Sequence, residues 1–388
     1  MAKLIEITGR ALSGEWGTDD ETGCGIPVLR TTNFTNEGIV DYTDVVTRTI
    51  TKKKIEEKYL RKGDIIIEKS GGSDKQPVGR VVYFDGADST YLFNNFTGLL
   101  RVKDQKIWYP RYVFFSLFSN YRRGGTRKFE NKTTGLHNLK VDDYVSRYEV
   151  REEDIPKQIA ICEQLDLILD IIRNRQHQLK KLDELVKARF VEMMDSAELS
   201  DEMTIEQITS CVKVGFVGTC ETHYTDNSGI PMLRTGNITD HGIDMRELKY
   251  VTLKFHESNK KSQIHNGDLL IARHGSNGQA NVYEGPEAQC LNAVVIVPNQ
   301  SIARSKFLAA LINSPMVKKQ IDRYLVGSTQ HVVNTKSIAN LVVRLPSLQM
   351  QEKFQNFVEQ ADKSKIAVQK ALDEAQLLFD SLMQKYFE

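Results

Sequence analysis

Two stretches of the chain carry the seven-residue hydrophobic repeat that is typical of paired helices. Residues 157–195 follow Pro156 and residues 347–388 follow Pro346, and neither stretch contains glycine or proline. A proline near the first helical position, followed by dozens of residues without a breaker, predicts one long helix. Each helix of about 40 residues would be about 60 Å long.

Apolar residues recur at every seventh position in both stretches. In the first they are Leu165, Ile172, Leu179, Val186 and Met193; in the second they are Phe354, Ala361, Val368, Ala375 and Leu382, with Val358, Leu372 and Phe379 on a neighbouring column. This spacing predicts a coiled-coil core in which each helix buries its stripe against the other. Ile168, Leu169 and Phe190 lie beside the seam and are predicted to remain exposed for a partner.

The rest of the chain is a duplication. GIPVLRTTNFTNEGI begins at Gly25 and GIPMLRTGNITDHGI at Gly229; LRKGDIIIEKSGG contains Gly63 and IHNGDLLIARHGS contains Gly267. The two glycines of each pair are 204 positions apart, and two matches at one offset indicate a repeated structural unit.

Each repeat shows strand and turn signals with one short helix. Residues 65–67, 81–84, 269–271 and 293–297 are apolar and rich in β-branched residues, which predicts strands, whereas 113–119 and 306–312 are predicted helices. The fold class is therefore α+β: two similar domains, 1–150 (domain 1) and 199–345 (domain 2), and two long helices, 151–198 and 346–388. If the helices pack on each other they are antiparallel, with one domain at each end and a two-fold pseudosymmetry.

Composition and charge change this picture little. The chain of 388 residues is 40% hydrophobic and 27% charged with a formal net charge of +1, typical of globular proteins. No signal peptide and no membrane-spanning run is recognisable, and the five cysteines form no C-x-x-C pair, so we expect a cytoplasmic protein with buried free thiols and no structural zinc.

Two similar domains held apart by a spacer can contact two separated places on one extended ligand, and duplex DNA is such a ligand. These features resemble those of a known family. The order of two globular units and two long helices, the motifs GIPVLRTTN and GIPMLRTGN, and LDELVKARFVEMM from Leu182 all resemble the specificity subunit of type I restriction-modification enzymes.

The resemblance implies that each domain is a target recognition domain reading one half of a split DNA sequence. It also implies that the helices are the spacer and the docking surface for two methyltransferase (modification) subunits, and that restriction/translocase subunits join the complex. S-adenosylmethionine, ATP and Mg²⁺ would serve those partners, and this chain would need no cofactor.

Recognisable catalytic motifs are missing from the sequence. We find no G-x-S-x-G, no P-loop and no H-E-x-x-H, so no catalytic or metal-binding residue is predicted. One alternative is a non-catalytic scaffold whose end domains bind proteins; another is a duplicated enzyme with unrecognised catalytic loops. A scaffold would show no salt-dependent affinity for DNA, and only an enzyme would show turnover alone.

Candidate DNA contacts are basic or amide side chains in the loops, where arginine and lysine suit phosphates or guanine and glutamine and asparagine suit adenine. In domain 1 they are Lys52, Lys53, Lys54, Lys69, Ser70, Ser73, Lys75, Gln76, Arg80, Arg122, Arg123, Arg127 and Lys128. In domain 2 they are Lys260, Lys261, Arg273, His274, Ser276, Asn277, Gln279, Ser328, Thr329, Gln330 and His331. For each the alternative is an ordinary solvated loop.

The segments that follow the paired strands, from Lys69 and from Arg273, share a framework and differ in side chains, as two readers of different sequences should. Arg30 and Arg234, like Asn33 and Asn237, are the same in both repeats. Residues shared by both halves cannot distinguish two sequences, so these four are expected to have a structural or a phosphate-binding role, of which the structural one is favoured.

Overall fold

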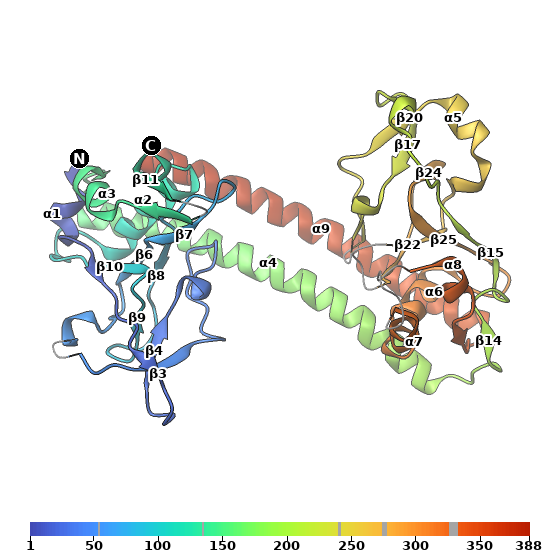
Figure 1. Ribbon diagram of the computed structural model, residues 1–388, viewed down its shortest axis with the longest axis horizontal. Coiled ribbons are helices and arrows are strands. Elements are labelled where there is room, and N and C mark those ends of the chain that lie inside the picture. Colours follow the sequence, from blue (N-terminus) through green and yellow to red (C-terminus); the bar gives the residue numbers. More distant parts are fainter. Residues whose placement is uncertain (53–54, 134–135, 240–241, 274–277, 326–332) are drawn as a thin grey trace. The chain divides into compact units, whose positions relative to one another are not determined.

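The computed structural model describes residues 1–52, 55–133, 136–239, 242–273, 278–325 and 333–388. The chain forms two compact units (Figure 1): unit 1 comprises Met1–Arg175 and Ala371–Glu388, and unit 2 comprises Gln176–Lys370. Each unit therefore contains one globular domain and part of each long helix. The division of the chain into 1–150, 151–198, 199–345 and 346–388 stays a prediction.

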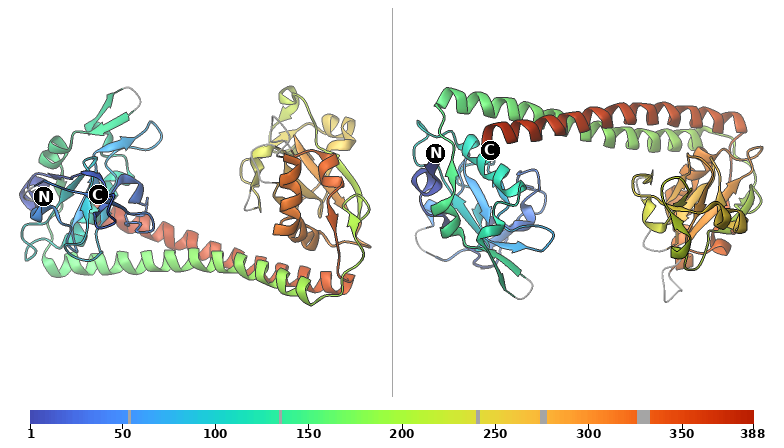
Figure 2. Two further views of the ribbon diagram at one scale, coloured as in Figure 1. Left: turned by 60° about the horizontal axis from the view of Figure 1, so that its bottom comes forward. Right: turned by 90° about the horizontal axis from the view of Figure 1, so that it is seen from above.

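The long helices are α4, Ile155–Ser196, and α9, Leu348–Phe387, so both predicted helices are present, with ends within two residues of the breaker-free stretches 157–195 and 347–388. Within each unit the helices lie side by side in both views of Figure 2. In unit 2, Phe190 of α4 lies against Phe354 of α9, and Asp183 of α4 pairs with Lys365 of α9. As α4 advances, α9 runs back, so the two helices are antiparallel there.

Among its described residues, unit 1 contains four small sheets. Their strands, in spatial order, are β1 (Ala2–Lys3) and β13 (Glu149–Val150); β2 (Leu12–Ser13), β10 (Thr97–Leu100), β6 (Ile65–Glu68) and β8 (Val81–Tyr83); β3 (Thr18–Asp19), β5 (Val46–Thr49), β4 (Ile26–Leu29) and β9 (Leu92–Phe93); and β11 (Glu130–Thr133), β12 (Leu136–Leu139) and β7 (Ser70–Gly72). The short helices are α1 (Leu4–Thr8), α2 (Pro110–Arg122) and α3 (Val141–Arg147).

Unit 2 repeats three of these sheets in the same order. They are β14 (Met203–Thr204) and β26 (Val342–Val343); β15 (Thr209–Val214), β25 (Ala293–Pro298), β22 (Leu269–Ala272) and β23 (Ala280–Val282); and β16 (Tyr224–Thr225), β20 (Lys249–Val251), β17 (Ile230–Leu233) and β24 (Ala288–Cys290), extended by β21 (Gln263–Ile264). A further pair is β18 (Ile238–Thr239) with β19 (Gly242–Ile243), and the helices are α5 (Leu253–Ser258), α6 (Ser305–Ile312), α7 (Pro315–Leu325) and α8 (Thr335–Ala339).

Pairing directions repeat as well as strand order. β4 runs parallel to β9 in unit 1, and β17 runs parallel to β24 in unit 2, whereas the other pairs of these two sheets are antiparallel. The glycines of the repeated Gly-Asp turn have positive φ angles, +96° at Gly63 and +92° at Gly267, a backbone conformation that favours glycine. The internal duplication and the α+β class predicted from the sequence are confirmed.

The core of each unit is continuous with its helices. In unit 1, Tyr112, Phe114 and Phe115 of α2 are buried between the sheet and the long helices, and Phe115 lies edge-on to Phe379 of α9. In unit 2, Phe307 of α6 is buried in the equivalent place and contacts Phe190 of α4 and Phe354 of α9. Burial of such large aromatic side chains is the main contribution to packing each domain against its helices.

The heptad residues are all buried or half-buried: Leu165, Ile172, Leu179, Val186, Met193, Phe354, Val358, Ala361, Val368, Leu372, Ala375, Phe379 and Leu382. The prediction that Ile168, Leu169 and Phe190 remain exposed was wrong. Their exposed fractions are 6%, 8% and 7%. All three belong to the cores that the globular domains share with the long helices; Phe190, for example, contacts both Phe354 of α9 and Phe307 of α6.

Candidate nucleic-acid interface

The arginine and asparagine shared by both repeats are structural. Asn33 accepts the backbone N–H of Arg30 at 2.9 Å and donates to the carbonyl oxygens of Asp41 and Asp44. In domain 2, Asn237 accepts the N–H of Arg234 at 3.0 Å and donates to the carbonyl oxygen of Asp244.

Both arginine side chains are also held internally. Nη2 of Arg30 donates to the Asp44 carbonyl, and Nη2 of Arg234 donates to that of Glu247. These contacts fix the turn after β4 and after β17, so the motif builds the scaffold of each domain.

Lys69 lies at the end of β6 and is the centre of a basic surface in domain 1. Its Nζ donates to Ser13 Oγ at 2.8 Å, and its backbone N–H donates to the carbonyl of Phe96 at 2.8 Å. Burial lowers the pKa of Lys69, and the nearby charge of Lys58 lowers it further. Phe96, whose carbonyl accepts the backbone hydrogen bond from Lys69, is 53% exposed, so a lysine and an exposed aromatic residue are neighbours here, an arrangement suited to a phosphate and a base face.

Lys52 and Lys58 complete this surface. Both donate to Glu15, Lys52 at 2.8 Å, and these two hydrogen bonds hold the pKa of the Glu15 carboxyl below its usual value. We call Ser13, Glu15, Lys52, Lys58, Lys69 and Phe96 the Lys69 surface. It contains three lysines and one carboxylate, and the charge of Asp142 also acts on Lys69. Sequence reasoning selected Lys52 and Lys69 and missed Phe96, although an aromatic residue after Asn94-Asn95 in a turn is a usable signal.

The segment after Lys69 is mostly exposed. Ser70 is half-buried in β7, which pairs with β12, and Ser73 and Lys75 are exposed in the loop that follows. Gln76 is held by its side chain, whose Nε2 donates to Asn36 Oδ1 and to the Tyr121 hydroxyl, both at 3.2 Å.

Arg80 points into the domain. Its Nη1 donates to the Phe34 carbonyl at 2.7 Å, and its Nη2 donates to the Thr31 carbonyl at 2.9 Å and to Glu68 Oε1 at 3.3 Å. Burial raises the pKa of Glu68, although the charge of Arg80 opposes that shift. Arg80 therefore joins β8 to the turn after β4, and this internal role replaces the predicted DNA contact.

Arg122 and Arg123 are held by the end of α9. Arg122 Nη1 lies 2.7 Å from Asp380 Oδ1, and Arg123 Nη1 lies 2.8 Å from Glu388 Oε1. These ion pairs attach α2 to the C-terminal part of α9, so the two arginines hold the globular domain of unit 1 against that helix. A sequence scan could not identify their partners, which are more than 250 residues away.

The other basic residues of this cluster remain near the surface. Arg127 Nη2 donates to the carbonyl of Asp74 at 3.3 Å, and Lys128 Nζ lies 5.3 Å from the centroid of the Phe129 ring. Both side chains are exposed.

In domain 2 the described candidates are fewer. Lys260 and Lys261 are exposed in the turn Lys260–Ser262; Arg273 and Gln279 are half-buried at the end of β22 and just before β23. The remaining predicted contacts lie outside the described residues: Lys53, Lys54, His274, Ser276, Asn277, Ser328, Thr329, Gln330 and His331.

In the part of the chain that the structure describes, no group of three or more His, Cys, Asp or Glu residues is arranged to hold a metal ion. Nor does any helix among those residues have the length and apolarity needed to cross a membrane. All five cysteines are free, and Cys24 and Cys211 are exposed, so the prediction that the thiols are buried was wrong for these two.

Two solved structures share this fold along the whole chain. One is the crystal structure of the S subunit of a type I restriction-modification system from M. genitalium, with a TM-score of 0.61 and 16% identity over 100% of this chain and 95% of that one. The other comes from work on complex assembly and conformational transition of the type I R-M system, with a TM-score of 0.53 and 13% identity over 100% and 97%. The fold is that of a specificity subunit.

The model of the type I restriction modification DNA specificity domain matches residues 2–144 and 212–375. The chain therefore belongs to the type I restriction-modification DNA specificity family.

Two curated relatives are similar to part of the chain. The EcoBI specificity subunit of Escherichia coli is 28% identical over 169 residues, which are 41% of this chain and 35% of that protein. The putative MjaX specificity subunit of Methanocaldococcus jannaschii is 23% identical over 198 residues, 49% of this chain and 46% of that protein. The matched parts thus span less than half the length of either relative.

Proposed function

We propose that this chain is the DNA-recognition subunit of a type I restriction-modification complex and that each globular domain reads one half of a bipartite target. The observation that carries the proposal is the repetition of one strand order in both units, with different side chains after β6 and β22. A shared scaffold with divergent loops suits two readers of different sequences.

In domain 1 the Lys69 surface is the part best suited to DNA. Lys52 is largely exposed and Lys69 neighbours an exposed aromatic residue, so phosphate contact and base stacking are available within one surface. Lys75, Arg127 and Lys128 add exposed positive charge elsewhere in the same domain.

The long helices would set the distance between the half-sites and receive two methyltransferase subunits. Large apolar side chains remain exposed on them: Leu167, Ile171, Leu377 and Leu378 in unit 1, and Leu185, Val191 and Ile366 in unit 2. Side chains of this kind, with Leu377 at 72% and Ile366 at 71% exposure, are suited to burial against another protein.

The chemistry would belong to the partners. We propose that the methyltransferase subunits bind S-adenosylmethionine, that restriction/translocase subunits use ATP and Mg²⁺, and that this chain supplies recognition without catalysis.

The experiment that tests the proposal is mapping methylated adenines in cells that produce the methyltransferase subunits with or without this chain. The expected result is methylation at one gapped sequence only when the chain is present. Methylation that does not depend on the chain would overturn the proposal. Absence of salt-dependent DNA binding by the assembled complex would favour a protein-binding scaffold instead.

A further inference from the structure

One buried amide occupies the same position in both long helices. Gln158 is the fourth residue of α4 and Gln351 is the fourth residue of α9. Their exposed fractions are 0% and 1%. A fully buried glutamine near a helix start requires partners for one acceptor and two donors.

Each amide has those partners, and they are equivalent in the two units. The N–H of Tyr109 donates to Gln158 Oε1 at 2.8 Å, while Gln158 Nε2 donates to the carbonyls of Ile107 at 2.9 Å and Glu153 at 2.8 Å. Glu153 lies five residues before Gln158, as Pro346 lies five residues before Gln351, so each side chain also holds the segment that leads into the long helix.

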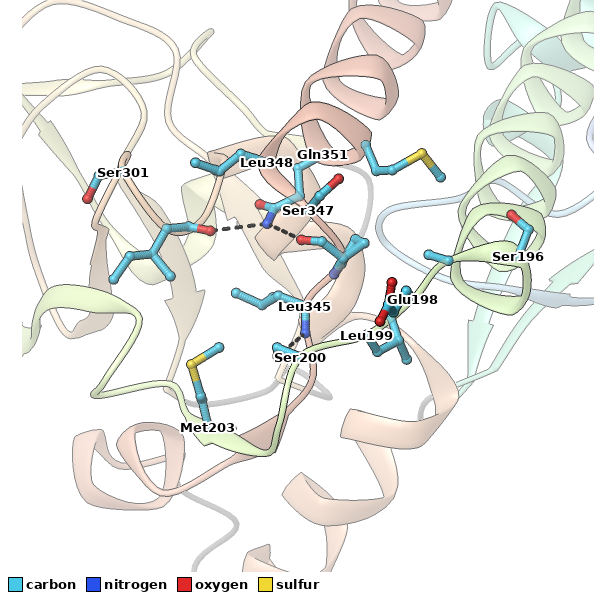
Figure 3. A pocket seen from close by; sticks show the side chains of 14 residues that line it. Ser196, Glu198, Leu199, Ser200, Met203, Ser301, Leu345, Ser347, Leu348 and Gln351 are labelled. Carbon is cyan, nitrogen blue, oxygen red and sulfur yellow. Dashed lines mark hydrogen bonds between the residues drawn. The ribbon is translucent and has the colours of Figure 1, made fainter.

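In unit 2 the N–H of Arg304 donates to Gln351 Oε1 at 2.9 Å. Gln351 Nε2 donates to the carbonyls of Ile302 at 3.1 Å and Pro346 at 3.0 Å. Figure 3 shows this amide at the start of α9, beside Ser347 and Leu348.

The residues that donate to the two glutamines begin the main helix of each domain. Tyr109 is the N-cap of α2 and Arg304 is the N-cap of α6, and neither receives a cap from its own side chain. The glutamine therefore joins the start of the long helix to the start of the domain helix, where backbone groups lack intrahelical partners.

A second contact crosses each joint. Arg111 Nε donates to Asp166 Oδ1 of α4 at 3.0 Å, and Lys306 Nζ lies 2.8 Å from Asp362 Oδ2 of α9. With two separated contacts, a domain can neither slide along its long helix nor turn on it without breaking a buried hydrogen bond or an ion pair.

We propose that Gln158 and Gln351 are positioning residues that fix the angle between each recognition domain and its long helix, and so restrict the gap lengths that the protein accepts. The inference rests on the proposed function. One base pair added to the gap moves a half-site by about 3.4 Å and turns it by about 35°. A rigid joint rejects that displacement, and a loosened joint accommodates it.

A hollow lies beside Gln351. It measures about 690 Å³ and is lined by both sides of the joint, including Ser200, Met203, Leu345 and Leu348 (Figure 3).

The test uses the complete chain assembled with its methyltransferase subunits and DNA carrying the mapped half-sites with the native gap or a gap one base pair longer or shorter. The Gln351→Ala variant is expected to lose about tenfold of the preference for the native gap while each half-sequence stays the same. Gln158→Ala, which alters the joint of unit 1, is expected to lower the preference for the native gap by a similar factor. Gln349→Ala, at an exposed position of the same helix, is the matched control and should behave as the unchanged chain.

A Gln351→Ala complex that methylates with the unchanged gap preference would overturn the inference, because a merely stabilising residue lowers activity at all gaps equally. If Gln351→Ala does not fold, Asp362→Asn decides, since it weakens the same joint at a half-buried position. A gap preference unaltered in that variant would overturn the inference too. Failure of the proposed function is separately visible, because the unchanged chain would then show no gap preference.

Discussion

Lys365 of α9 places its Nζ 2.7 Å from Oδ1 of Asp183 on α4, an ion pair that links the two long helices within unit 2. The aromatic contact of Phe190 with Phe354, 5.6 Å between ring centroids, lies further along the same pair of helices. Together they define one antiparallel register, and a shift of either helix by one turn would break both.

Reversing one charge of this pair should destabilise unit 2. Because both side chains are partly exposed, Asp183→Lys is expected to lower the free energy of unfolding by about 0.5–1 kcal/mol, and the double exchange Asp183→Lys with Lys365→Asp should recover most of it. Urea unfolding measures the change. If the loss of unfolding free energy in the double variant equals the sum of the losses in the two single variants, the pair does not couple the helices.

Phe354 should be among the most sensitive positions of the helices. It is 0% exposed and contacts Phe190 and Phe307. Phe354→Ala is expected to lower the free energy of unfolding by about 3–5 kcal/mol, because it leaves a cavity in the core that joins helix and domain. Ile366→Ala, at 71% exposure on the same helix, is the control and should change it by about 0.5 kcal/mol at most. Equal losses would contradict the packing described here.

Lys69→Ala should weaken DNA binding at every sequence and reduce the slope of log K against log salt by about 1, as loss of one phosphate contact requires. Fluorescence anisotropy of the assembled complex at several salt concentrations measures that slope. Arg123→Ala serves as the control, because its ion pair with Glu388 attaches α2 to α9, and its loss should lower stability with the slope unchanged. A slope that is reduced in Arg123→Ala and unchanged in Lys69→Ala would show that the DNA contact lies near Arg123 and not at Lys69.

The two repeated Gly-Asp turns should respond oppositely to loss of charge. Arg101 pairs with Asp64 in domain 1, with Nε 2.7 Å from Oδ1 and Nη2 2.6 Å from Oδ2. In domain 2, burial raises the pKa of Asp268, although the hydrogen bond from the His265 N–H opposes the shift. Asp64→Asn should therefore destabilise the protein, whereas Asp268→Asn should stabilise it at pH 7 by about 1 kcal/mol or less.

The pH dependence follows from the direction of the Asp268 shift. A carboxyl whose pKa is raised by folding costs stability while it is ionised, and that cost is lost as the pH falls through its folded-state pKa. The difference between the unchanged chain and Asp268→Asn should thus shrink between pH 7 and about pH 4. Thermal unfolding across that range measures it, and a constant difference would contradict the assignment.

Lengthening both long helices should widen the gap between the half-sites. Seven residues inserted after Arg175 and seven after Lys370 keep the heptad in phase and add about 10.5 Å, close to three base pairs. Methylation mapping of this variant should show both half-sequences unchanged and a wider gap. Retention of the original gap would refute the proposed role of the helices as a spacer.

Much of the fold follows from local sequence. The long helices, the duplication and the strands β6 and β22 depend on periodicity, breaker-free length and repeated motifs, which are local signals. Ile168 and Phe190 were misjudged because a heptad describes only the face toward the partner helix. Here the globular domain adds contacts beside that seam, such as Phe307 of α6 against Phe190, and no helical period indicates them.

The joints could not be predicted for a different reason. Gln158 is two residues after Pro156 and Gln351 is five after Pro346, so the two amides do not align by their prolines. Each also looks like an ordinary polar position on an exposed helix. The partners of Arg122 and Arg123 are equally invisible, because ion pairs between residues far apart in the chain depend on the tertiary fold.

The assignment of Ala371–Glu388 to unit 1 has a consequence for biogenesis. Domains tend to fold in order as the ribosome produces them, and the first to emerge is usually the first to mature. Here Phe379 and Met383 belong to the core that also contains α2, so that core stays incomplete until Ala371–Glu388 has been translated. Unit 2, all of which is made by residue 370, can close earlier, which reverses the usual order of maturation.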